Sequence, residues 1–396
     1  MTKNDDKRVP VLRFKGFNDD WAQRKLKDLT DVRDGTHSSP KYVEAGHPFI
    51  TSKNINNGSI DYRDIKYITD EDFDEINKRS KVDIHDILMG MIGTVGNLAL
   101  IDKKPNFAIK NIALIKDIGK IDYLFLYNFL QSNYVSKELI QKLDGGTQKF
   151  ISLNKVRDLN ISVASFQEQK AISKCLMRVN NLLILQQRKL QQLKLLKKAM
   201  LQDLFTDKNV PKLRFNGFDA NWIQCKLEKE ALLTMGQSPS GSTYSDQPST
   251  YILVQGNADL KNGWVKPRIW TTQITKLAKK GDIIITVRAP AGKVGRTNFD
   301  VVLGRGVASI QGNDFIFYLL SKMDMNKYWK KYAAGSTFES INSNDIKNTR
   351  VHVPNLPEQN RIANLFLRLD DLIRFQQNKL NNLQKTKQFL FQNMFI

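Results

Sequence analysis

Apolar side chains recur at alternating steps of four and three residues along two long stretches of the chain. In the first stretch these positions are Ile172, Leu176, Val179, Leu183, Gln186, Leu190, Leu193, Lys197, Met200 and Leu204. In the second they are Ile362, Phe366, Leu369, Ile373, Gln376, Leu380, Leu383, Lys387, Leu390 and Met394. This spacing places one apolar seam along an α-helix, which is the heptad pattern of a coiled coil. It predicts two long helices, over residues 165–206 and 355–396.

Both stretches open with residues that favour a helix start. Ser165 and Glu168 have the spacing of a capping box, and Asn355 offers a cap with Pro357 in the first turn. Polar residues interrupt both seams at the same heptad steps, namely Gln186, Gln376, Lys197 and Lys387. Such residues lower stability but fix register and partner choice. We therefore expect the two helices to pair with each other, in an antiparallel coiled coil.

Further apolar residues lie off the seams, among them Leu182, Leu185, Leu195, Leu196, Phe205, Leu372, Phe375, Phe389 and Phe391. A two-helix coil needs only one apolar seam on each helix. The surplus indicates that the helix pair also contacts either another protein or the globular parts of its own chain. The sequence leaves both alternatives open.

The chain repeats itself around these helices. Val9-Pro-Val-Leu-Arg-Phe-Lys-Gly-Phe17, followed by Trp21, returns as Val210-Pro-Lys-Leu-Arg-Phe-Asn-Gly-Phe218, followed by Trp222, at an offset of 201 residues (Val9 to Val210). From Gly145 onwards the two halves align without a gap at an offset of 190 (Leu190 to Leu380). Between these flanks, residues 28–144 and 229–334 share little. An internal repeat of this kind predicts one scaffold used twice.

The two variable stretches have mixed patterns that predict strands at 84–89, 108–116, 282–287 and 301–310, and helices at 123–143 and 315–332. Gly93-Thr-Val-Gly96 and Gly292-Lys-Val-Gly295 are expected in matching loops after the first strand of each set. The predicted fold class is α+β, with a pseudo-twofold internal repeat. Its parts are a globular domain over 1–164, a helix over 165–206, a second globular domain over 207–354 and a second helix over 355–396.

The net charge of the chain indicates which class of partner it binds. The chain of 396 residues carries 61 Lys and Arg against 40 Asp and Glu, a formal net charge of +21 that is spread over its whole length. An excess of this size indicates a polyanionic partner, most commonly nucleic acid. The two cysteines and four histidines form no metal-ligand pattern, and no run of eighteen apolar residues or signal peptide is present. We expect a cytoplasmic protein without metal or other cofactor.

Enzyme motifs are missing from the sequence. Ala289-Pro-Ala-Gly-Lys-Val294 lacks the first glycine and the final Ser or Thr of a phosphate-binding loop. Gly90-Met-Ile-Gly93-Thr-Val-Gly96 is followed by a strand-like segment rather than the helix of a dinucleotide site. No methyltransferase tetrapeptide or nuclease constellation is found. The chain by itself is therefore predicted to be non-catalytic.

Polar loops, in contrast, carry side chains of the types that proteins use to read DNA bases. Direct readout uses Arg or Lys for guanine, Asn or Gln for adenine, and small hydroxyl side chains. Candidate DNA-binding residues of the first half are Thr36, His37, Ser39, Lys41, Lys53, Asn54, Thr147, Gln148 and Lys149. Those of the second half are Gln237, Ser238, Tyr244, Gln255, Asn257, Arg288, Lys293, Arg296, Ser336 and Thr337. They lie early, in the middle and late in each half, as a composite recognition face requires; ordinary polar loops are the alternative.

The whole chain resembles the specificity (S) subunits of type I restriction–modification systems. The resemblance lies in the two variable stretches, the Leu-Arg-Phe-x-Gly-Phe openings, the Gly-x-Val-Gly turns, and the duplicated heptad helices preceded by Ser165-Phe-Gln-Glu-Gln169 and Asn355-Leu-Pro-Glu-Gln359. The first of these segments departs from the family in lacking the proline. The resemblance implies two target recognition domains that each read one half of a bipartite, asymmetric site in double-stranded DNA. It also implies that the helices separate the two domains and dock two methyltransferase subunits, with restriction subunits joining the complex. A coiled-coil nucleic-acid-binding regulator or scaffold without a methyltransferase partner is the alternative.

Overall fold

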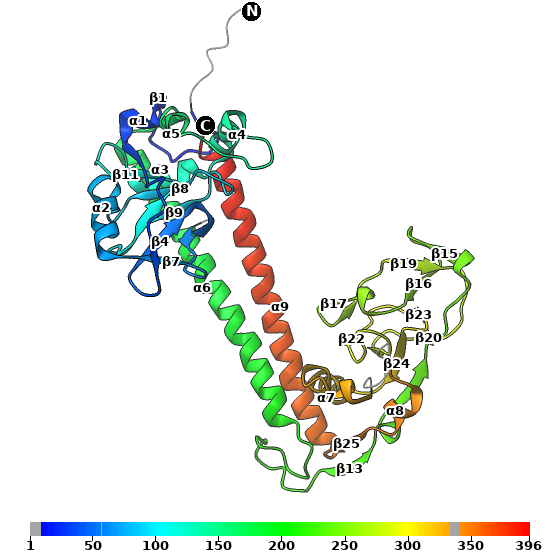
Figure 1. Cartoon of the computed structure of the whole chain (residues 1–396). Coiled ribbons are helices and arrows are strands. Elements are labelled where there is room, and N and C mark those ends of the chain that lie inside the picture. Colours follow the sequence, from blue (N-terminus) through cyan, green and yellow to red (C-terminus); the bar gives the residue numbers. More distant parts are fainter. Residues whose placement is uncertain (1–8, 57, 333–339) are drawn as a thin grey trace, which may run out of the picture. The chain divides into compact units, whose positions relative to one another are not determined.

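The computed structural model of the chain describes residues 9–56, 58–332 and 340–396 (Figure 1). Its contacts divide the chain into two units. Unit 1 consists of Met1–Gln186 with Lys379–Ile396, and unit 2 of Gln187–Asn378. Each unit therefore holds one globular part together with about half of each long helix.

The two predicted long helices are α6 (Phe166–Leu204) and α9 (Leu356–Asn393), of 39 and 38 residues. All twenty seam positions are buried or half-buried, which confirms the heptad pattern. The helices run side by side in opposite directions (Figure 1). In unit 1 the start of α6 packs with the end of α9, as Ile172 and Leu176 share a core with Met394. In unit 2 the end of α6 packs with the start of α9, as Leu204 shares a core with Ile362. The antiparallel pairing is therefore confirmed.

The described strands of unit 1 form four sheets. These are the pair β1 (Ala22–Lys25) with β12 (Asn160–Val163); the antiparallel sheet β2 (Asp31–Asp34), β11 (Ile112–Lys116), β8 (Ile87–Gly90) and β9 (Leu98–Leu100); the sheet β10 (Ala108–Lys110), β4 (His47–Thr51), β7 (Lys66–Ile68) and β3 (Tyr42–Val43); and the hairpin β5 (Ile55–Asn56) with β6 (Ser59–Ile60). The shorter helices are α1 (Leu26–Leu29), α2 (Asp70–Ser80), α3 (Tyr123–Leu130), α4 (Asn133–Lys142), α5 (Leu153–Arg157) and the 3-10 turn η1 (Ser52–Asn54).

In unit 2 the strands of the described ranges form three sheets. These are β13 (Ile223–Lys226) with β25 (Arg350–Val353); β14 (Leu232–Met235), β24 (Val307–Gln311), β21 (Ile283–Thr286), β22 (Val294–Arg296), β18 (Trp264–Val265) and β17 (Leu260–Lys261); and β15 (Tyr244–Ser245), β19 (Ile269–Thr271), β16 (Tyr251–Val254), β23 (Val301–Leu303) and β20 (Leu277–Ala278). Its shorter helices are α7 (Asp314–Met325), α8 (Ser343–Lys347) and the 3-10 turns η2 (Leu227–Lys229), η3 (Gly241–Thr243), η4 (Asn257–Asp259) and η5 (Tyr328–Tyr332).

The two units repeat one topology even where their sequences differ. The order β2-β11-β8-β9 in unit 1 matches β14-β24-β21-β22 in unit 2, and the parallel pair β4 and β10 matches β16 and β23. The first strand of each unit pairs with the strand that leads into a long helix, Ala22 opposite Val163 and Ile223 opposite Val353. The predicted internal repeat is therefore present in three dimensions.

Several predicted elements are divided in the structure. The strand expected over 108–116 is broken at Asn111, which has φ +53, into β10 and β11. The strand expected over 301–310 is broken between Leu303 and Val307 into β23 and β24. The helix expected over 123–143 ends at Leu130 and restarts as α4 behind the cap Ser132, whose hydroxyl accepts from Val135 N–H. The helix expected over 315–332 likewise gives way to η5 after α7. Apolar spacing alone does not reveal such short interruptions.

The two glycine-rich turns lie in matching places after β8 and β21, but their Gly-x-Val-Gly sequences are offset by three residues in the structure. Gly96 N–H donates to Gly90 O at 3.0 Å, and Gly292 N–H donates to Thr286 O at 2.7 Å. Both glycines have positive φ, of +82 and +84. Gly96, rather than Gly93, is therefore the counterpart of Gly292.

A repeated ion pair explains the repeated openings. Arg13 and Arg214 each bind the carboxylate of a glutamate in the first turn of a long helix, Glu168 in unit 1 and Glu358 in unit 2. We call these two ion pairs the Arg–Glu clamps. The caps predicted for the helix starts are present, because the side-chain oxygens of Ser165 and Asn355 accept from the N–H groups of Glu168 and Glu358. The Glu168 carboxylate, however, binds Arg13 and Trp21 instead of completing a reciprocal capping box.

Each opening also binds the end of the opposite helix. Leu12 N–H donates to the carbonyl of Asn393 in α9 at 2.8 Å, and Leu213 N–H donates to that of Asp203 in α6 at 2.9 Å. The last carbonyls of a helix lack partners within the helix, so these bonds satisfy groups that the helix leaves open. The opening segment thus connects the start of one long helix to the end of the other within each unit.

Matching aromatic clusters fill the two cores. In unit 1 Trp21 packs edge-on against Phe125 with ring centroids 5.6 Å apart, and Phe395 lies against Phe125. In unit 2 Trp222 packs edge-on against Phe315 at 5.7 Å, and Phe205 lies against the same ring. A phenylalanine just beyond the end of each long helix therefore belongs to a globular core.

Candidate nucleic-acid interface

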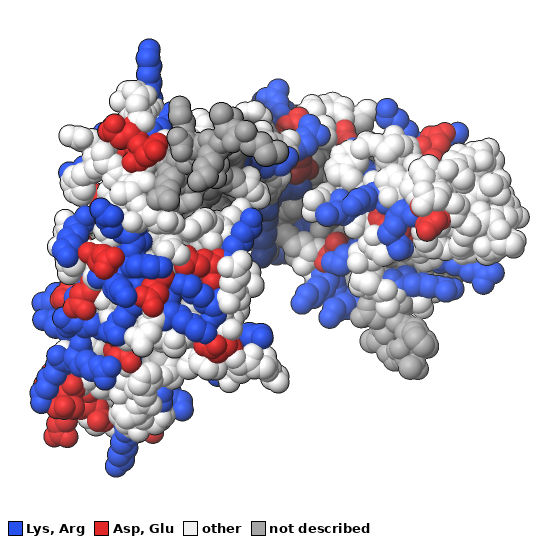
Figure 2. Space-filling model, turned by 90° about the horizontal axis from the view of Figure 1, so that it is seen from above, with Lys and Arg blue, Asp and Glu red and all other residues white. Residues whose placement is uncertain are grey.

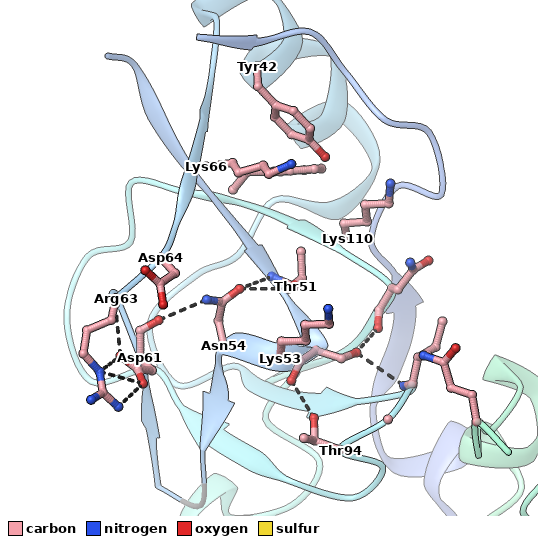
Figure 3. Close-up of a pocket in the computed structure, with 16 residues that line it drawn as sticks. Tyr42, Thr51, Lys53, Asn54, Asp61, Arg63, Asp64, Lys66, Thr94 and Lys110 are labelled. Carbon is pink, nitrogen blue, oxygen red and sulfur yellow. Dashed lines mark hydrogen bonds and ion pairs between the residues drawn. The ribbon is translucent and has the colours of Figure 1, made fainter. Parts of the chain in front are cut away.

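Polar loops of unit 1 surround an open hollow of about 860 Å³ (Figure 3). Several segments far apart in the sequence line it. Tyr42 and Lys66 come from the strands β3 and β7, Lys53 from the turn η1, and Lys110 from the end of β10. Gln148 reaches it from the late loop that also contains Thr147 and Lys149. The structure thus brings the middle and late predicted loops of the first half together.

Positive charge predominates in this hollow. Four cationic side chains, Lys53, Arg63, Lys66 and Lys110, line it together with two acidic ones, Asp61 and Asp64. Arg63 donates to both carboxylate oxygens of Asp61, and these bonds lower the pKa of Asp61 to about 2. Arg63 and Asp61 therefore balance each other throughout the neutral pH range.

The three lysines of the hollow remain available to a ligand. None of them forms an ion pair with a carboxylate of the described residues; Lys66 Nζ lies 4.1 Å from the centre of the Tyr42 ring, and Lys110 donates to Ser39 Oγ. A ring with an ammonium beside it offers a stacking surface and a positive charge at one place. Both are features of nucleic-acid sites.

The early loop borders the same hollow. Thr36 N–H donates to Ile109 O at 3.1 Å, next to Lys110. His37 bridges two elements, as its Nε2 lies 2.8 Å from Asp34 Oδ2 and its Nδ1 lies 2.9 Å from Asn111 Oδ1. Ser39 contacts Lys110, and Lys41 is exposed beside Tyr42. All four early candidates therefore belong to this region.

Asn54 has a structural task that its sequence position does not reveal. Its side-chain oxygen accepts from both the N–H and the hydroxyl of Thr51, and its amide nitrogen donates to Asp61 O at 3.2 Å. These bonds hold the turn η1 in shape. Asn54 thus positions Lys53. Both the oxygen and the nitrogen of its amide are already bound within unit 1.

The late loop is folded back on itself. Lys149 Nζ donates to Gly145 O at 2.9 Å, and Gly93 N–H donates to Lys149 O at 3.0 Å. Thr147, Gln148 and Lys149 are exposed. The loop is therefore attached to the glycine turn after β8, with its polar side chains open to solvent.

In unit 2 the early and middle candidates also meet. Gln237 N–H donates to Leu303 O at 2.8 Å, and Ser238 Oγ accepts from Arg305 N–H at 3.0 Å. Gln255 lies against Gly304 and Gly306, and its N–H donates to Asp259 Oδ2 at 2.7 Å. Asn257 opens η4 and is exposed. Tyr244 donates its hydroxyl proton to Pro239 O at 3.3 Å and is half-buried.

The remaining candidates of the second half lie elsewhere. Lys293 and Arg296 are bound by carboxylates of α7, Asp324 at 2.8 Å and Asp314 respectively. The Arg296 side chain is only 14% exposed and stacks on Phe317, so its guanidinium is already bound within unit 2. Arg288 is exposed at the end of β21 and pairs with Ser340 through its backbone. Ser336 and Thr337 lie outside the described residues.

Basic residues that the sequence analysis missed include Lys66, Lys110 and Arg305. Lys110 ends the short strand β10 and Arg305 lies two residues after β23, whereas the apolar pattern predicts one continuous strand at each place. A turn signal was present at Arg305, because glycines flank it on both sides. Lys66 carried no such signal. Across the face shown in Figure 2, lysine and arginine of unit 1, on the left, lie among acidic side chains.

No helix among the described residues is long and apolar enough to cross a membrane. In the same part of the chain, no group of three or more His, Cys, Asp or Glu side chains is placed to hold a metal ion.

Comparison with known proteins identifies the family. A model of the type I restriction modification DNA specificity domain matches residues 18–195 and 234–385. A protein of Methanocaldococcus jannaschii, provisionally named as the type I restriction enzyme MjaX specificity subunit, is 29% identical over 396 residues, covering 93% of this chain and 91% of its own. The type I restriction enzyme MjaIX specificity subunit of that organism is 30% identical over 207 residues, or 46% of each chain.

Solved structures share the fold. A structure from work on complex assembly and conformational transition of the type I R-M system has a TM-score of 0.62 at 21% identity, covering 96% of this chain and 98% of that chain. The crystal structure of the S subunit of a type I restriction–modification system from M. genitalium has a TM-score of 0.62 at 15% identity, covering 98% and 99%. The family model covers most of both halves, including most of each long helix. The chain therefore belongs to the family of type I restriction–modification DNA specificity subunits.

Proposed function

We propose that residues 1–164 and 207–354 are two target recognition domains, which read different halves of one bipartite, asymmetric site in double-stranded DNA. The observation that carries this proposal is the equivalence of Thr36 and Gln237. Both follow a glycine whose N–H bonds to the central strand, Gly35 to Ile112 O and Gly236 to Val307 O. The backbone is the same at both places while the side chains differ. Two readers built in this way select different bases.

Affinity in this proposal comes from the basic side chains around the loops, and selectivity from the loop side chains. Lys53 and Lys66 of the hollow are suited to phosphate oxygens, because no described carboxylate neutralises them. Phosphate contacts fix the register of a protein on DNA but carry no sequence information. Base selection then falls to side chains such as Gln148 and Gln237, whose amides can pair with adenine.

The helix pair carries two matched apolar patches that fit a partner present in two copies. Leu182 and Leu185 of α6 are 45% and 57% exposed, and their counterparts at the offset of 190, Leu372 and Phe375 of α9, are 52% and 66% exposed. Exposed apolar pairs at equivalent places favour docking over internal packing. We assign them to two methyltransferase subunits, with restriction subunits joining through the assembled complex. The chain itself supplies specificity and no catalysis.

The proposal is tested by mapping methylated bases in cells that express this chain with the methyltransferase of its system. One bipartite motif is expected, and it should disappear when the chain is deleted. A genome without such a motif would contradict the proposal. Exchange of residues 28–144 for the same segment of another specificity subunit should change one half of the motif only. A change in both halves would contradict the proposal that each domain reads one half-site.

A further inference from the structure

One short turn of unit 2 touches two of the predicted recognition loops. It consists of Gly304, Arg305 and Gly306, between β23 and β24. Arg305 N–H donates to Ser238 Oγ of the early loop. A Cβ atom on Gly306 would lie 2.0 Å from Gln255 O of the middle loop, which only glycine tolerates. The turn therefore lies between these loops in close backbone contact with them.

Unit 1 has the same arrangement. The equivalent turn is formed by Lys110, the last residue of β10, and Asn111, which separates β10 from β11. Asn111 N–H donates to Thr36 O at 3.3 Å, and Asn111 Oδ1 contacts His37 of the early loop. A Cβ atom on Gly35 would lie 2.4 Å from Ile109 O, as one on Gly236 would lie 2.1 Å from Gly304 O. A basic residue thus occupies this turn in both units.

The side chain of Arg305 is free to bind a ligand. It is exposed, and its guanidinium forms no ion pair with a described carboxylate. Two other arginines of unit 2 are engaged, as Arg268 donates to Asp259 at 3.1 Å and Arg296 pairs with Asp314. The backbone of Arg305 is held by Ser238, so the side chain starts from a fixed point. A fixed base for a long side chain reduces the ordering cost of binding.

We propose that this turn is a base-reading element in both recognition domains, and that Arg305 recognises a guanine in the half-site read by unit 2. The guanidinium presents two parallel N–H donors, which match the O6 and N7 acceptors of guanine in the major groove. Lys110 places a single ammonium at the equivalent position of unit 1, where it binds without that two-point geometry. The inference rests on the proposed function and adds a residue and a base to it.

The test uses the whole chain with its methyltransferase and compares Arg305→Ala, Arg305→Lys and Arg350→Ala. Arg350 is an exposed arginine of β25, so its loss removes the same charge elsewhere in unit 2. Methylation is mapped across the genome, and binding is measured on duplexes in which the guanine is replaced. The half-site of unit 2 is the half that stays unchanged when residues 28–144 are exchanged.

Arg305→Ala is expected to lose roughly 5- to 100-fold of the preference for guanine at one position of this half-site. Arg305→Ala should leave the sequence preference at the other half-site unchanged, and Arg350→Ala should keep the full preference for guanine. Arg305→Lys should recover only part of that preference. A half-site without guanine, or an Arg305→Ala variant that binds all sequences more weakly without relaxing any position, overturns the inference. Neither result affects the bipartite motif. Absence of any bipartite motif with the wild-type chain instead overturns the proposed function, and the inference with it.

Discussion

Arg13 donates two hydrogen bonds, of 2.7 and 2.8 Å, to the carboxylate of Glu168, whose side chain is only 1% exposed. This clamp holds the opening segment of the chain on the first turn of α6. The hydrogen bonds to Glu168 raise the pKa of Arg13, which therefore stays charged at any physiological pH. Arg214 and Glu358 repeat the clamp on α9 with the same exposures, 14% for the arginine and 1% for the glutamate.

The two clamps differ in one hydrogen-bond partner, and we therefore expect their loss to cost different amounts of stability. Trp21 Nε1 also donates to Glu168, at 3.2 Å, whereas Trp222 Nε1 has no partner among the described residues. Loss of one member of a buried pair leaves an uncompensated charge and costs about 3 kcal/mol or more. Arg214→Ala should therefore lower the free energy of unfolding more than Arg13→Ala does. Urea unfolding with hydrogen exchange at the first turns of α6 and α9 measures this order, and equal losses would contradict it.

Replacement of the two seam lysines by methionine should have different effects on the free energy of unfolding. Lys197 pairs with Asp370, which also accepts from Tyr318. Lys387 is half-buried, and burial lowers its pKa. We expect Lys197→Met to destabilise by about 1 to 2 kcal/mol, and Lys387→Met to be neutral or stabilising by about 1 kcal/mol.

Lys387 also predicts a dependence on pH. Because its pKa is lower in the folded state, the charged form opposes folding. Wild-type stability should therefore rise as the pH rises from the lowered value towards about 10.4, the ordinary value for lysine. The Lys387→Met variant should lack this rise while Lys197→Met keeps it. Urea unfolding midpoints measured from pH 7 to 10 test this expectation. An unchanged pH profile in Lys387→Met would show that the rise in stability does not come from Lys387.

Gly35 should not tolerate a side chain. A Cβ atom there would meet Ile109 O at 2.4 Å, whereas one on Gly146 would meet nothing within 4 Å. Gly35→Ala must displace the turn at Lys110 and is expected to destabilise unit 1 by about 1 to 3 kcal/mol. It should also weaken methylation through one half-site. Gly146→Ala is the control in the same unit, and a normal methylation pattern in Gly35→Ala would argue against a role for this turn.

The lysines of the hollow should determine part of the salt dependence of DNA binding. Each phosphate contact contributes about −0.9 to the slope of log K against log salt. Lys53→Ala and Lys66→Ala should each make the slope shallower by about one and weaken binding to all sequences alike. Lys137→Ala, at an exposed position of α4, removes the same charge away from the hollow. Equal slopes for Lys53→Ala and wild type would remove this residue from the interface.

The matched apolar patches should each hold one copy of the methyltransferase. Leu185→Glu and Phe375→Glu place a charge in one patch each, and each variant should retain one bound copy instead of two. The double variant should retain none, because burial of an unpaired charge is costly. Gln187→Glu introduces the same charge at an exposed polar position. Stoichiometry is measured by co-purification and native mass spectrometry, and two copies on the double variant would exclude these patches.

Much of the scaffold could be predicted from the order of residues because it depends on local periodicity. The heptad steps of α6 and α9 place Leu190 and Leu380 on the same helix faces in any context, and the repeat made two similar units necessary. The break at Asn111 could not be predicted, since a single residue of positive φ leaves the apolar pattern of a strand intact. At Gly304-Arg305-Gly306 the two glycines were a turn signal, but the apolar residues on both sides predicted one continuous strand.

The candidate site stays a prediction, to which the structure adds detail. The residue types of Lys53, Gln148 and Gln237 indicated polar loops, because polar turn residues carry a local signal, and the structure leaves all three residues exposed. Sequence could not separate Asn54, whose amide is used by its own turn, from residues with free side chains. It could not identify Arg296 as buried either, because its partner Asp314 lies on another element.

By itself, then, the sequence determined the family, the two paired helices and the internal repeat, all of which follow from spacing along the chain. Only the tertiary structure decided which basic residues are neutralised and which remain available to DNA. Charge pairing is set by distances between elements far apart in sequence, as between Arg13 and Glu168 or Arg296 and Asp314. Such distances exist only once the backbone has folded, and they leave Lys53, Lys110 and Arg305 facing solvent without a carboxylate among the described residues.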